Sequence, residues 1–332
     1  MLLMNLKCHT GTSQLQLLIQ ISGSDYMLVR GIIPPMITPL KEHEILDYDG
    51  IENLIEHLYA GGVHGLFILG TTGEGASLSY DLRYELTERV CSQVNGRVQV
   101  LVGITDTSLT ESLKLAGKAD DFGADAVVAA PPYYFKTNQS ELISYFRSVA
   151  DESPLPVFLY NMPSHTKVSF EPETIRILSD HPNIIGFKDS SGDLIYFQKV
   201  IQLLKNKKDF SLLTGPEEIL MQSLLSGGHG GVNGGANMFP KLYVSMHEAA
   251  IRKDFERMTS LQKTILQISS TIYNVGDSPA SYLQGLKCTL SLMGICNDTM
   301  AAPYKAFDSE KRKVIESSLK KLDMKELLSL KS

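Results

Sequence analysis

The chain alternates short apolar runs with longer segments whose apolar residues recur at helical spacing, and this alternation constrains the fold most strongly. Several apolar runs are nearly continuous in Val, Ile, Leu and Ala, which is typical of parallel strands buried on both faces. The predicted strands are Ile32–Thr38, Gly65–Leu69, Val98–Ile104, Asp125–Ala130, Pro156–Tyr160, Ile184–Lys188, Phe210–Thr214 and Gly230–Asn233.

Amphipathic segments fill the intervals between these runs. The predicted helices are Ile51–Leu58, Asp81–Val94, Leu109–Phe122, Glu141–Ala150, Pro172–Leu178, Leu194–Leu204 and Glu217–Leu225. Eight strands alternating with helices predict an α/β fold, a (β/α)₈ TIM barrel over residues 28–245. An open doubly wound sheet is disfavoured because no glycine cluster completes GxGxxG after the first strand.

The strand signal stops after about residue 240. A C-terminal helical region, residues 246–332, is predicted to contain His247–Ile268, Ala280–Leu292 and Ser309–Leu328, and it carries no chemical motif. Residues 1–27 are predicted to be an extension that is disordered or follows from a mis-assigned start. A secretory signal is disfavoured, because the apolar patch near residue 15 lacks a basic flank and a cleavage site.

Composition excludes several classes of function. A net charge of −6 and a pI near 5.8 argue against a nucleic-acid or anionic-membrane partner, and no apolar stretch is long enough to span a bilayer. The four cysteines form no CxxC pair, which indicates reduced thiols in a cytoplasmic protein. The eight histidines form no HExxH motif, so we expect no metal site.

Lys188 closes the sixth predicted strand and is followed by the polar run Asp189-Ser190-Ser191-Gly192-Asp193. A lysine at this end of a buried strand can attack a keto acid if its surroundings keep part of the amine unprotonated. The alternative is a solvated ammonium group at a strand end.

The loops that follow barrel strands build the active site in this fold. Gly70-Thr71-Thr72-Gly73-Glu74 offers hydroxyls and backbone amides to a carboxylate, although a turn with a helix cap would give the same pattern. Tyr160 lies one strand before Lys188, so its phenol can face the amine and both give and take a proton. Further strand ends carry Pro131-Pro132-Tyr133-Tyr134-Phe135 and Thr214-Gly215-Pro216-Glu217-Glu218.

The motifs GTTGE, PPYY, YNMPSHT, GFKDSSGD and GGHGGV, in this order over residues 30–305, resemble the dihydrodipicolinate synthase / N-acetylneuraminate lyase family. The resemblance implies a class I, pyruvate-dependent barrel enzyme that needs no cofactor. It also implies a homo-oligomer, either a dimer or a dimer of dimers. The expected small-molecule partners are pyruvate and an aldehyde or 2-keto acid.

The resemblance also implies residue roles. Lys188 forms an imine with the ketone, and Tyr160 is the acid and base at the reacting carbon. Thr71 and Thr72, with Gly73, hold the keto-acid carboxylate. The backbone carbonyl of Val232 is implied to face the same pocket. Tyr134 is implied to reach into the neighbouring subunit's site, where it links Thr71 to Tyr160.

The second substrate is harder to assign. Dihydrodipicolinate synthases carry an arginine in YNxPxRT that binds the carboxylate of aspartate semialdehyde, whereas this chain has His165. Gly215 and Glu217 resemble the Gly-x-acid-acid segment that holds sugar hydroxyls in the lyases, but Thr214 to Glu217 also fits a capping box. The lyase branch often has Ser-Thr after strand eight, where this chain has Gly234-Gly235.

Our leading hypothesis is a Schiff-base aldolase that cleaves a 2-keto-3-deoxy sugar acid or 4-hydroxy-2-oxoglutarate to pyruvate and an aldehyde. The alternatives are a 4-hydroxytetrahydrodipicolinate synthase and a keto-deoxy sugar acid dehydratase. A catalytically inactive barrel that binds a keto acid is the alternative of a different class.

Overall fold

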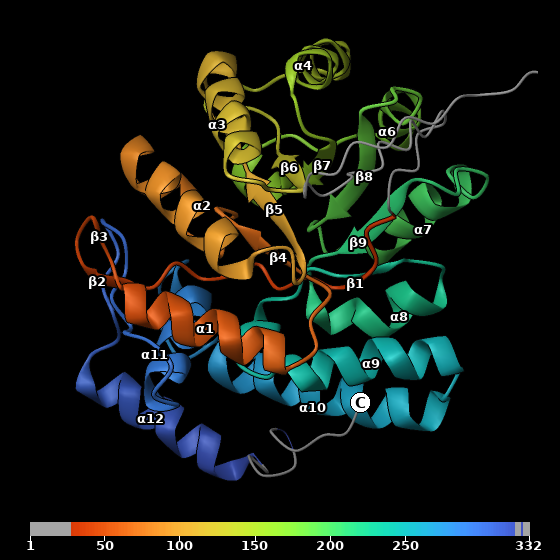
Figure 1. Ribbon diagram of the computed structural model, residues 1–332. Coiled ribbons are helices and arrows are strands. Elements are labelled where there is room, and N and C mark those ends of the chain that lie inside the picture. Colours follow the sequence, from red (N-terminus) through yellow and green to blue (C-terminus); the bar gives the residue numbers. More distant parts are fainter. Residues whose placement is uncertain (1–27, 323–326, 328–332) are drawn as a thin grey trace, which may run out of the picture.

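The computed structural model describes residues 28–322 and residue 327, so the predicted N-terminal extension lies outside the described residues (Figure 1). Eight parallel strands form one sheet in the order β1-β10-β9-β8-β7-β6-β5-β4. Their bounds are β1 Gly31–Ile32, β4 Gly65–Ile68, β5 Gln99–Gly103, β6 Ala126–Ala129, β7 Val157–Asn161, β8 Ile184–Asp189, β9 Ser211–Thr214 and β10 Gly230–Gly231.

Backbone hydrogen bonds between the segment after β1 and strand β4 close the sheet. Pro35 bridges Phe67, the Met36 amide donates to the Phe67 carbonyl at 2.8 Å, and the Phe67 amide donates to the Pro34 carbonyl at 2.9 Å. The (β/α)₈ barrel is thereby confirmed. The first strand was predicted to run to Thr38, which is wrong: it ends at Ile32, and Pro34 and Pro35 have no amide hydrogen to continue a ladder.

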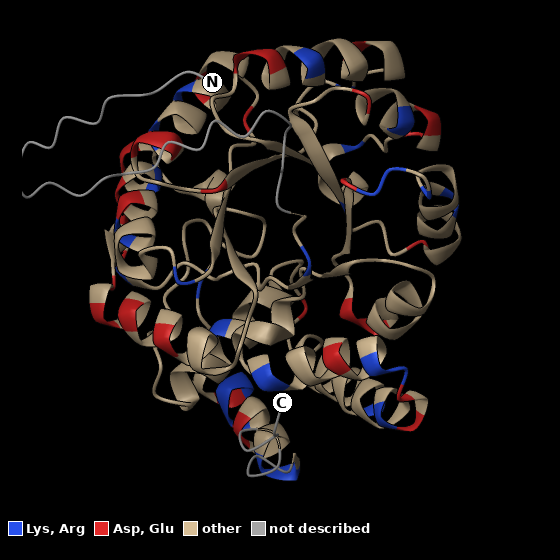
Figure 2. Ribbon diagram, turned by 45° about the vertical axis from the view of Figure 1, so that its right-hand side comes forward, with Lys and Arg blue, Asp and Glu red and all other residues tan. Residues whose placement is uncertain are grey.

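Helices surround the strands in Figures 1 and 2, and Figure 2 shows charged residues along these outer helices. The bounds of the surrounding helices are α1 Tyr48–Ala60, α2 Tyr80–Val94, α3 Leu109–Asp121, α4 Gln139–Glu152, α6 Pro172–Leu178, α7 Leu194–Leu203 and α8 Leu220–Leu225. Five of them begin after a side chain that accepts a backbone amide of the first turn, and these N-caps are Asp47, Ser79, Ser108, Asn138 and Asp193.

Short elements that the periodicity did not predict connect the larger ones. They are the hairpin β2 Leu40–Glu42 and β3 Ile45–Leu46, helix α5 Pro163–Thr166, and the 3₁₀ turns η1 Gly75–Ser77, η2 Glu217–Ile219 and η3 Gly234–Asn237. Turn η2 occupies the start of the segment predicted as one helix over Glu217–Leu225, so that prediction is corrected to a 3₁₀ turn followed by α8.

The C-terminal helices lie together on one side of the barrel in Figure 1. Their bounds are α9 Pro240–Arg252, α10 Phe255–Ile272, α11 Ser281–Leu292 and α12 Ser309–Lys321. The single predicted helix His247–Ile268 is wrong, because Lys253 has a left-handed backbone (φ 58°) and Asp254 caps a new helix. The predicted limit of the barrel, residue 245, lies inside α9.

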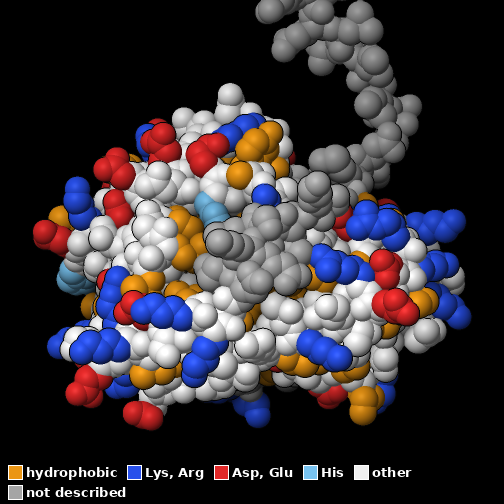
Figure 3. All heavy atoms as spheres, turned by 90° about the horizontal axis from the view of Figure 1, so that it is seen from below, with side chains coloured by type: hydrophobic (Ala, Val, Ile, Leu, Met, Phe, Trp, Pro, Cys, Tyr) orange, Lys and Arg blue, Asp and Glu red, His pale blue; other side chains and the backbone are white. Residues whose placement is uncertain are grey.

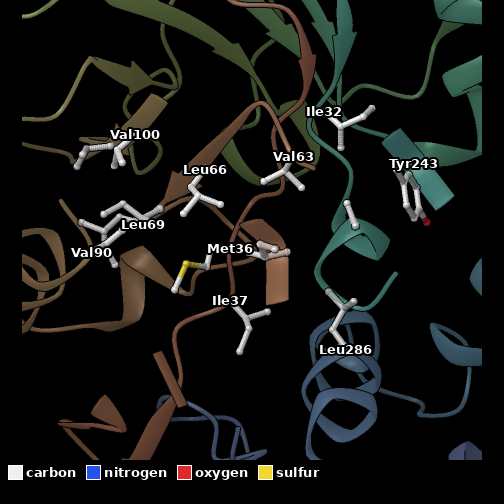
Figure 4. Close-up of a cluster of buried hydrophobic side chains, with 14 of the residues drawn as sticks. Ile32, Met36, Ile37, Val63, Leu66, Leu69, Val90, Val100, Tyr243 and Leu286 are labelled. Carbon is white, nitrogen blue, oxygen red and sulfur yellow. The ribbon is translucent and has the colours of Figure 1, made fainter. Parts of the chain in front are cut away.

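Buried apolar side chains form two layers. One fills the barrel and includes Phe67, Phe158, Tyr160 and Val232. The larger layer lies between the barrel and its helices. Part of it appears in Figure 4, where Leu66 and Val100 of β4 and β5 lie with Met36 and with Leu286 of α11. Helix α11 therefore packs into the same core as the barrel strands.

On the face shown in Figure 3, the described Lys and Arg side chains are interspersed with Asp and Glu, and hydrophobic groups form small patches between them. No helix in the part of the chain that the structure describes has both the length and the apolar character needed to cross a membrane.

Candidate active site

Strand β8 contains a bulge that controls which of its side chains face the barrel interior. Val157 of β7 pairs with Ile184, but the next residue, Phe158, pairs with Gly186, so Ile185 is an extra residue in the ladder. An extra residue shifts the alternation of all later side chains by one position. As a result Lys188 points into the barrel.

Gly186 provides the space that this arrangement requires. A Cβ atom at this position would lie 2.1 Å from the ring of Phe158, which fills the barrel interior beside it. Any larger residue would therefore displace Phe158 or straighten the bulge.

Lys188 and Tyr160 are direct partners in β8 and β7. The Lys188 Nζ lies 4.1 Å from the centre of the Tyr160 ring and 4.8 Å from that of Phe67. Only 5% of Lys188 is exposed, so its reading as a solvated ammonium group is wrong. Burial lowers the pKa of Lys188, although Tyr160 and Asp189 oppose this effect, and the shift favours the free amine.

The segment Leu69–Glu74, which we call the threonine loop, follows β4. It begins and ends on residues with left-handed backbones, Leu69 (φ 57°) and Glu74 (φ 54°). The Thr71 Oγ1 lies 3.2 Å from the Tyr160 hydroxyl, and the Gly73 carbonyl accepts a 2.6 Å hydrogen bond from Thr38. Turn η1 receives no side-chain cap, so the helix-cap alternative for this loop is wrong.

The threonine loop is anchored at its far end by a buried ion pair. Glu74 pairs with Lys287 of α11, and both side chains are almost completely inaccessible. The other Glu74 oxygen accepts the Ala301 amide at 2.8 Å, while the Lys287 Nζ donates to the Thr299 carbonyl at 2.7 Å. The C-terminal region thus fixes the loop that carries Thr71 and Thr72.

The residues that follow Tyr160 and Lys188 hold the two strands together on the outer side of the barrel. The Asn161 amide donates to Asp189 at 2.8 Å, and Asn161 also accepts the Phe170 amide at 3.2 Å. Ser191 donates to the second Asp189 oxygen at 2.8 Å. The buried bond between Asn161 and Asp189 therefore links the two strands directly after Tyr160 and Lys188, and helps to fix the separation of these two residues.

Val232 and Gly215 lie at the ends of the last two strands. Val232 is buried in the barrel interior with Tyr160, and its amide donates to the Thr214 carbonyl at 2.8 Å. The Gly215 amide donates to the Asp189 carbonyl at 2.7 Å, and its own carbonyl accepts Asn233 at 2.8 Å. Both residues therefore belong to the same end of the barrel as Lys188.

Glu217 is buried, with its carboxylate surrounded by donors. One oxygen accepts hydrogen bonds from the Tyr243 and Tyr273 hydroxyls, both at 2.5 Å, and the other accepts the Gly235 amide at 3.1 Å. Burial raises the pKa of Glu217 to about 7, against the lowering effect of these bonds. The capping-box alternative is wrong, because the Thr214 hydroxyl has no hydrogen-bond partner among the described residues.

Two predicted site residues lie at the surface instead. Tyr134 is 81% exposed and stacks edge-on against the equally exposed Phe135. His165 is exposed on α5, where its Nδ1 lies 2.9 Å from the Ser164 hydroxyl. Partial desolvation, followed by the charge of Lys167, lowers the pKa of His165, so the ring is mostly neutral near pH 7.

The structure adds one residue that the sequence reasoning missed. Tyr282 of α11 places its hydroxyl 3.3 Å from the Thr72 Oγ1. The sequence of the C-terminal region contains no chemical motif, and no local pattern around Tyr282 indicates its contact with a loop 210 residues away.

Comparison with known proteins agrees with this geometry. The model of the Dihydrodipicolinate synthetase family matches residues 28–322. The 4-hydroxy-tetrahydrodipicolinate synthase of Methanocaldococcus jannaschii is 33% identical over 298 residues, which cover 90% of this chain and 100% of the relative.

Two solved structures are similar over most of the chain. Dihydrodipicolinate synthase from Bacteroides thetaiotaomicron is 56% identical, with a TM-score of 0.86 over 88% of this chain and 98% of that one. YagE, a prophage protein of the dihydrodipicolinic acid synthase family from E. coli K12, was solved in complex with pyruvate. It is 31% identical, with a TM-score of 0.84 over 89% of this chain and 98% of that one.

Proposed function

The chain belongs to the Dihydrodipicolinate synthetase family, whose members are lyases and synthases, and on that premise we propose that it forms an imine between Lys188 and pyruvate. The observation that carries the proposal is the buried Lys188 amine beside the Tyr160 phenol in the barrel interior. An inactive binding barrel is set aside, because the chain is an enzyme of this family.

In the proposed reaction, the free amine of Lys188 adds to the ketone carbon of pyruvate. Tyr160 passes a proton to the carbonyl oxygen, and water leaves to give the protonated imine. The Tyr160 phenolate then takes a methyl proton, which gives an enamine; the enamine carbon bonds to an aldehyde while Tyr160 returns the proton to the aldehyde oxygen. In the reverse direction Tyr160 takes the proton of the substrate hydroxyl as the carbon–carbon bond of the 2-keto acid breaks, and gives it to the enamine carbon. Water then hydrolyses the imine and releases pyruvate from Lys188.

The threonine loop is the proposed binding site for the keto-acid carboxylate. The hydroxyls of Thr71 and Thr72 and the amide of Gly73 are donors of the kind that an anion needs. Tyr160 lies between the threonine loop and Lys188, because its hydroxyl contacts Thr71 and its ring contacts the Lys188 amine. The Val232 carbonyl is proposed to face the same pocket.

We propose that a second copy of the chain completes each site. Tyr134 and Phe135 are both about four-fifths exposed, although aromatic side chains of this size are usually buried. By family resemblance Tyr134 would enter the neighbouring site beside Thr71 and Tyr160.

Three described cysteines, Cys91, Cys288 and Cys296, are free thiols, which supports a reducing, cytoplasmic location.

For the second substrate we propose a 2-keto acid of the 2-keto-3-deoxy sugar acid or 4-hydroxy-2-oxoglutarate type, which is cleaved to pyruvate and an aldehyde. A sugar acid, whose aldehyde product is uncharged, agrees best with the residue at position 165. His165 is mostly neutral and has no bidentate fork, so recognition of a second carboxylate lacks its usual group. Gly215 would lie beside the substrate hydroxyls. Glu217 already accepts hydrogen bonds from two tyrosines and one backbone amide, and it would have to lose some of them to bind substrate hydroxyls. This argues against a role of Glu217 in binding substrate.

A 4-hydroxy-tetrahydrodipicolinate synthase is the second candidate, and it is favoured by the names of the relatives described above. A keto-deoxy sugar acid dehydratase would use the same imine.

Borohydride reduction in the presence of pyruvate tests the imine, with Lys188→Ala as the blank. We expect a stable mass increase in the native enzyme alone; its absence at saturating pyruvate would overturn the proposal. Pyruvate release from N-acetylneuraminate, 2-keto-3-deoxygluconate and 4-hydroxy-2-oxoglutarate then identifies an aldolase. Trapping without release from any of them would favour the synthase or the dehydratase.

A further inference from the structure

Glu217 and three tyrosines from the C-terminal region form a group that we call the tyrosine cluster: Glu217, Tyr243 and Tyr273, which are buried, and Tyr282, which is partly buried. Tyr243 lies on α9, Tyr273 directly follows α10, and Tyr282 lies on α11. Glu217 follows β9 of the barrel. The cluster therefore joins three C-terminal helices to the end of the barrel that carries Lys188.

Within the cluster, Glu217 supports Tyr282 through the Tyr273 ring. The Tyr273 hydroxyl donates to Glu217 at 2.5 Å, and the Tyr273 ring meets the Tyr282 ring edge-on, with their centres 4.7 Å apart. Edge-to-face contact at this distance is a favourable arrangement for two aromatic rings. The orientation of Tyr282 thus depends on a neighbour that the buried carboxylate holds.

Glu217 also supports Tyr282 through the backbone after β10. The Gly235 amide donates to Glu217 at 3.1 Å, which fixes the Gly234-Gly235 turn. Gly234 packs so closely on the phenol that a Cβ there would lie 1.6 Å from the Tyr282 hydroxyl oxygen. The glycine at this position leaves the space that the phenol fills.

The supported hydroxyl of Tyr282 contacts Thr72 at 3.3 Å. Burial, ahead of the charge of Glu217, raises the pKa of Tyr282, so the phenol keeps its proton and can donate it. A threonine hydroxyl that accepts one hydrogen bond remains free to donate its own proton to an anion. The geometry therefore favours a Thr72 proton that is directed away from Tyr282.

We propose that Tyr282 is a positioning residue of this enzyme: by donating to Thr72, it directs the Thr72 hydroxyl proton toward the carboxylate of the bound keto acid. The inference rests on the proposed function, in which Thr72 binds that carboxylate. It assigns a role in pyruvate binding to a side chain of the C-terminal helical region.

The test measures the pyruvate concentration that gives half-maximal borohydride trapping. Tyr282→Phe keeps the ring and removes the donor, and we expect this concentration to rise about fivefold or more, the effect of one hydrogen bond to a binding group. The maximal extent of trapping should change little, because Lys188 and Tyr160 are intact. Gly234→Ala displaces the same hydroxyl without deleting it and should raise the concentration similarly.

Tyr243→Phe is the matched control. It removes a fully buried phenol that donates to Glu217 but has no hydrogen bond to Thr72 or to the Tyr282 hydroxyl in the described structure. We expect it to lower the melting temperature and to leave the half-trapping concentration within about twofold. A general loosening of the cluster would instead raise that concentration in both Tyr243→Phe and Tyr282→Phe, and would overturn the positioning role.

A double-mutant cycle with Thr72→Val separates action through Thr72 from direct contact with substrate. If Tyr282 acts through Thr72, adding Tyr282→Phe to Thr72→Val has no further effect. The proposal would be overturned if the two substitutions raised the half-trapping concentration independently, so that their factors multiplied in the double variant. It would also be overturned if Tyr282→Phe alone left this concentration unchanged. Failure of the native enzyme to be trapped at all would contradict the proposed function instead, so the two failures are distinct.

Discussion

Tyr160 and Lys188 face each other across neighbouring strands only because β8 carries one extra residue before Lys188. Up to Ile184 the side chains of β7 and β8 alternate in step, and the bulge at Ile185 then shifts the alternation. Without the bulge, Lys188 would point toward the surrounding helices. The nucleophile of the proposed reaction is thus placed by a backbone irregularity, of the kind that often lies beside active sites.

Gly186→Ala tests this dependence. The added methyl group would overlap the Phe158 ring, so we expect a loss of about 2 kcal/mol or more in the free energy of unfolding and a lower extent of pyruvate trapping. Gly117→Ala on α3 is the control: its Cβ would meet no atom within 4 Å, and the helix should gain up to about 1 kcal/mol. Equal stability of the two variants would show that the bulge tolerates a side chain.

Tyr160→Phe tests the proton transfer. The ring that covers the Lys188 amine remains, but the acid and base are lost, so we expect kcat to fall by a factor of about 10² to 10⁴. Rapid quenching with borohydride would report the rate of imine formation. Tyr196→Phe, which removes a partly buried hydroxyl that donates to the Phe170 carbonyl, should keep kcat and lose about 1 kcal/mol of stability. A kcat within threefold of native in Tyr160→Phe would exclude the role.

The sequence was sufficient for the barrel and for placing Tyr160 and Lys188 at the ends of neighbouring strands, because both depend on the order of strands along the chain. It was insufficient for the bulge at Ile185, which brings the two side chains to the same face, since a bulge leaves an apolar run looking continuous. It also gave no sign of Tyr282, because packing of α11 decides that contact and no local motif accompanies it. The break after Arg252 was missed because the apolar periodicity continues across Lys253 and Asp254.

His247 should make stability depend on pH. Burial, followed by the charges of His64 and Arg30, lowers the pKa of His247 to about 4, whereas the unfolded chain has the ordinary value of about 6.5. Between about pH 6.5 and pH 4, His247 is protonated in the unfolded state but stays neutral in the folded state. Stability is therefore complete above about pH 6.5 and falls as the pH drops toward 4, by up to about 3 kcal/mol.

Urea denaturation between about pH 7 and pH 5 measures this dependence. His247→Gln should reduce the slope of the free energy of unfolding against pH by an amount that corresponds to at most one proton. His43→Gln, which changes an exposed histidine, should leave this slope unchanged. Identical slopes for the native protein and His247→Gln would contradict the assignment.

Lys287→Met tests the buried ion pair that anchors the threonine loop. The substitution leaves the Glu74 carboxylate buried without its cation, so we expect a loss of about 3 to 5 kcal/mol in the free energy of unfolding. Adding Glu74→Gln to the same chain should recover much of that loss, because the uncompensated charge is then gone. Lys320→Met, in an exposed pair with Glu316, should cost less than about 1 kcal/mol. No recovery in the double variant would mean that the pair contributes through packing alone.

His165→Arg tests the choice of second substrate. An arginine at this position on α5 supplies a permanent charge and two parallel donors, which a neutral imidazole lacks. We expect kcat/KM for an aldehyde that carries a carboxylate, aspartate semialdehyde, to rise about tenfold or more, while cleavage of polyhydroxylated 2-keto acids gains nothing. Ser164→Arg adds the same charge one residue earlier and controls for general attraction of anions. Semialdehyde turnover that stays at background in His165→Arg, or that rises equally in both variants, would show that position 165 does not decide the substrate.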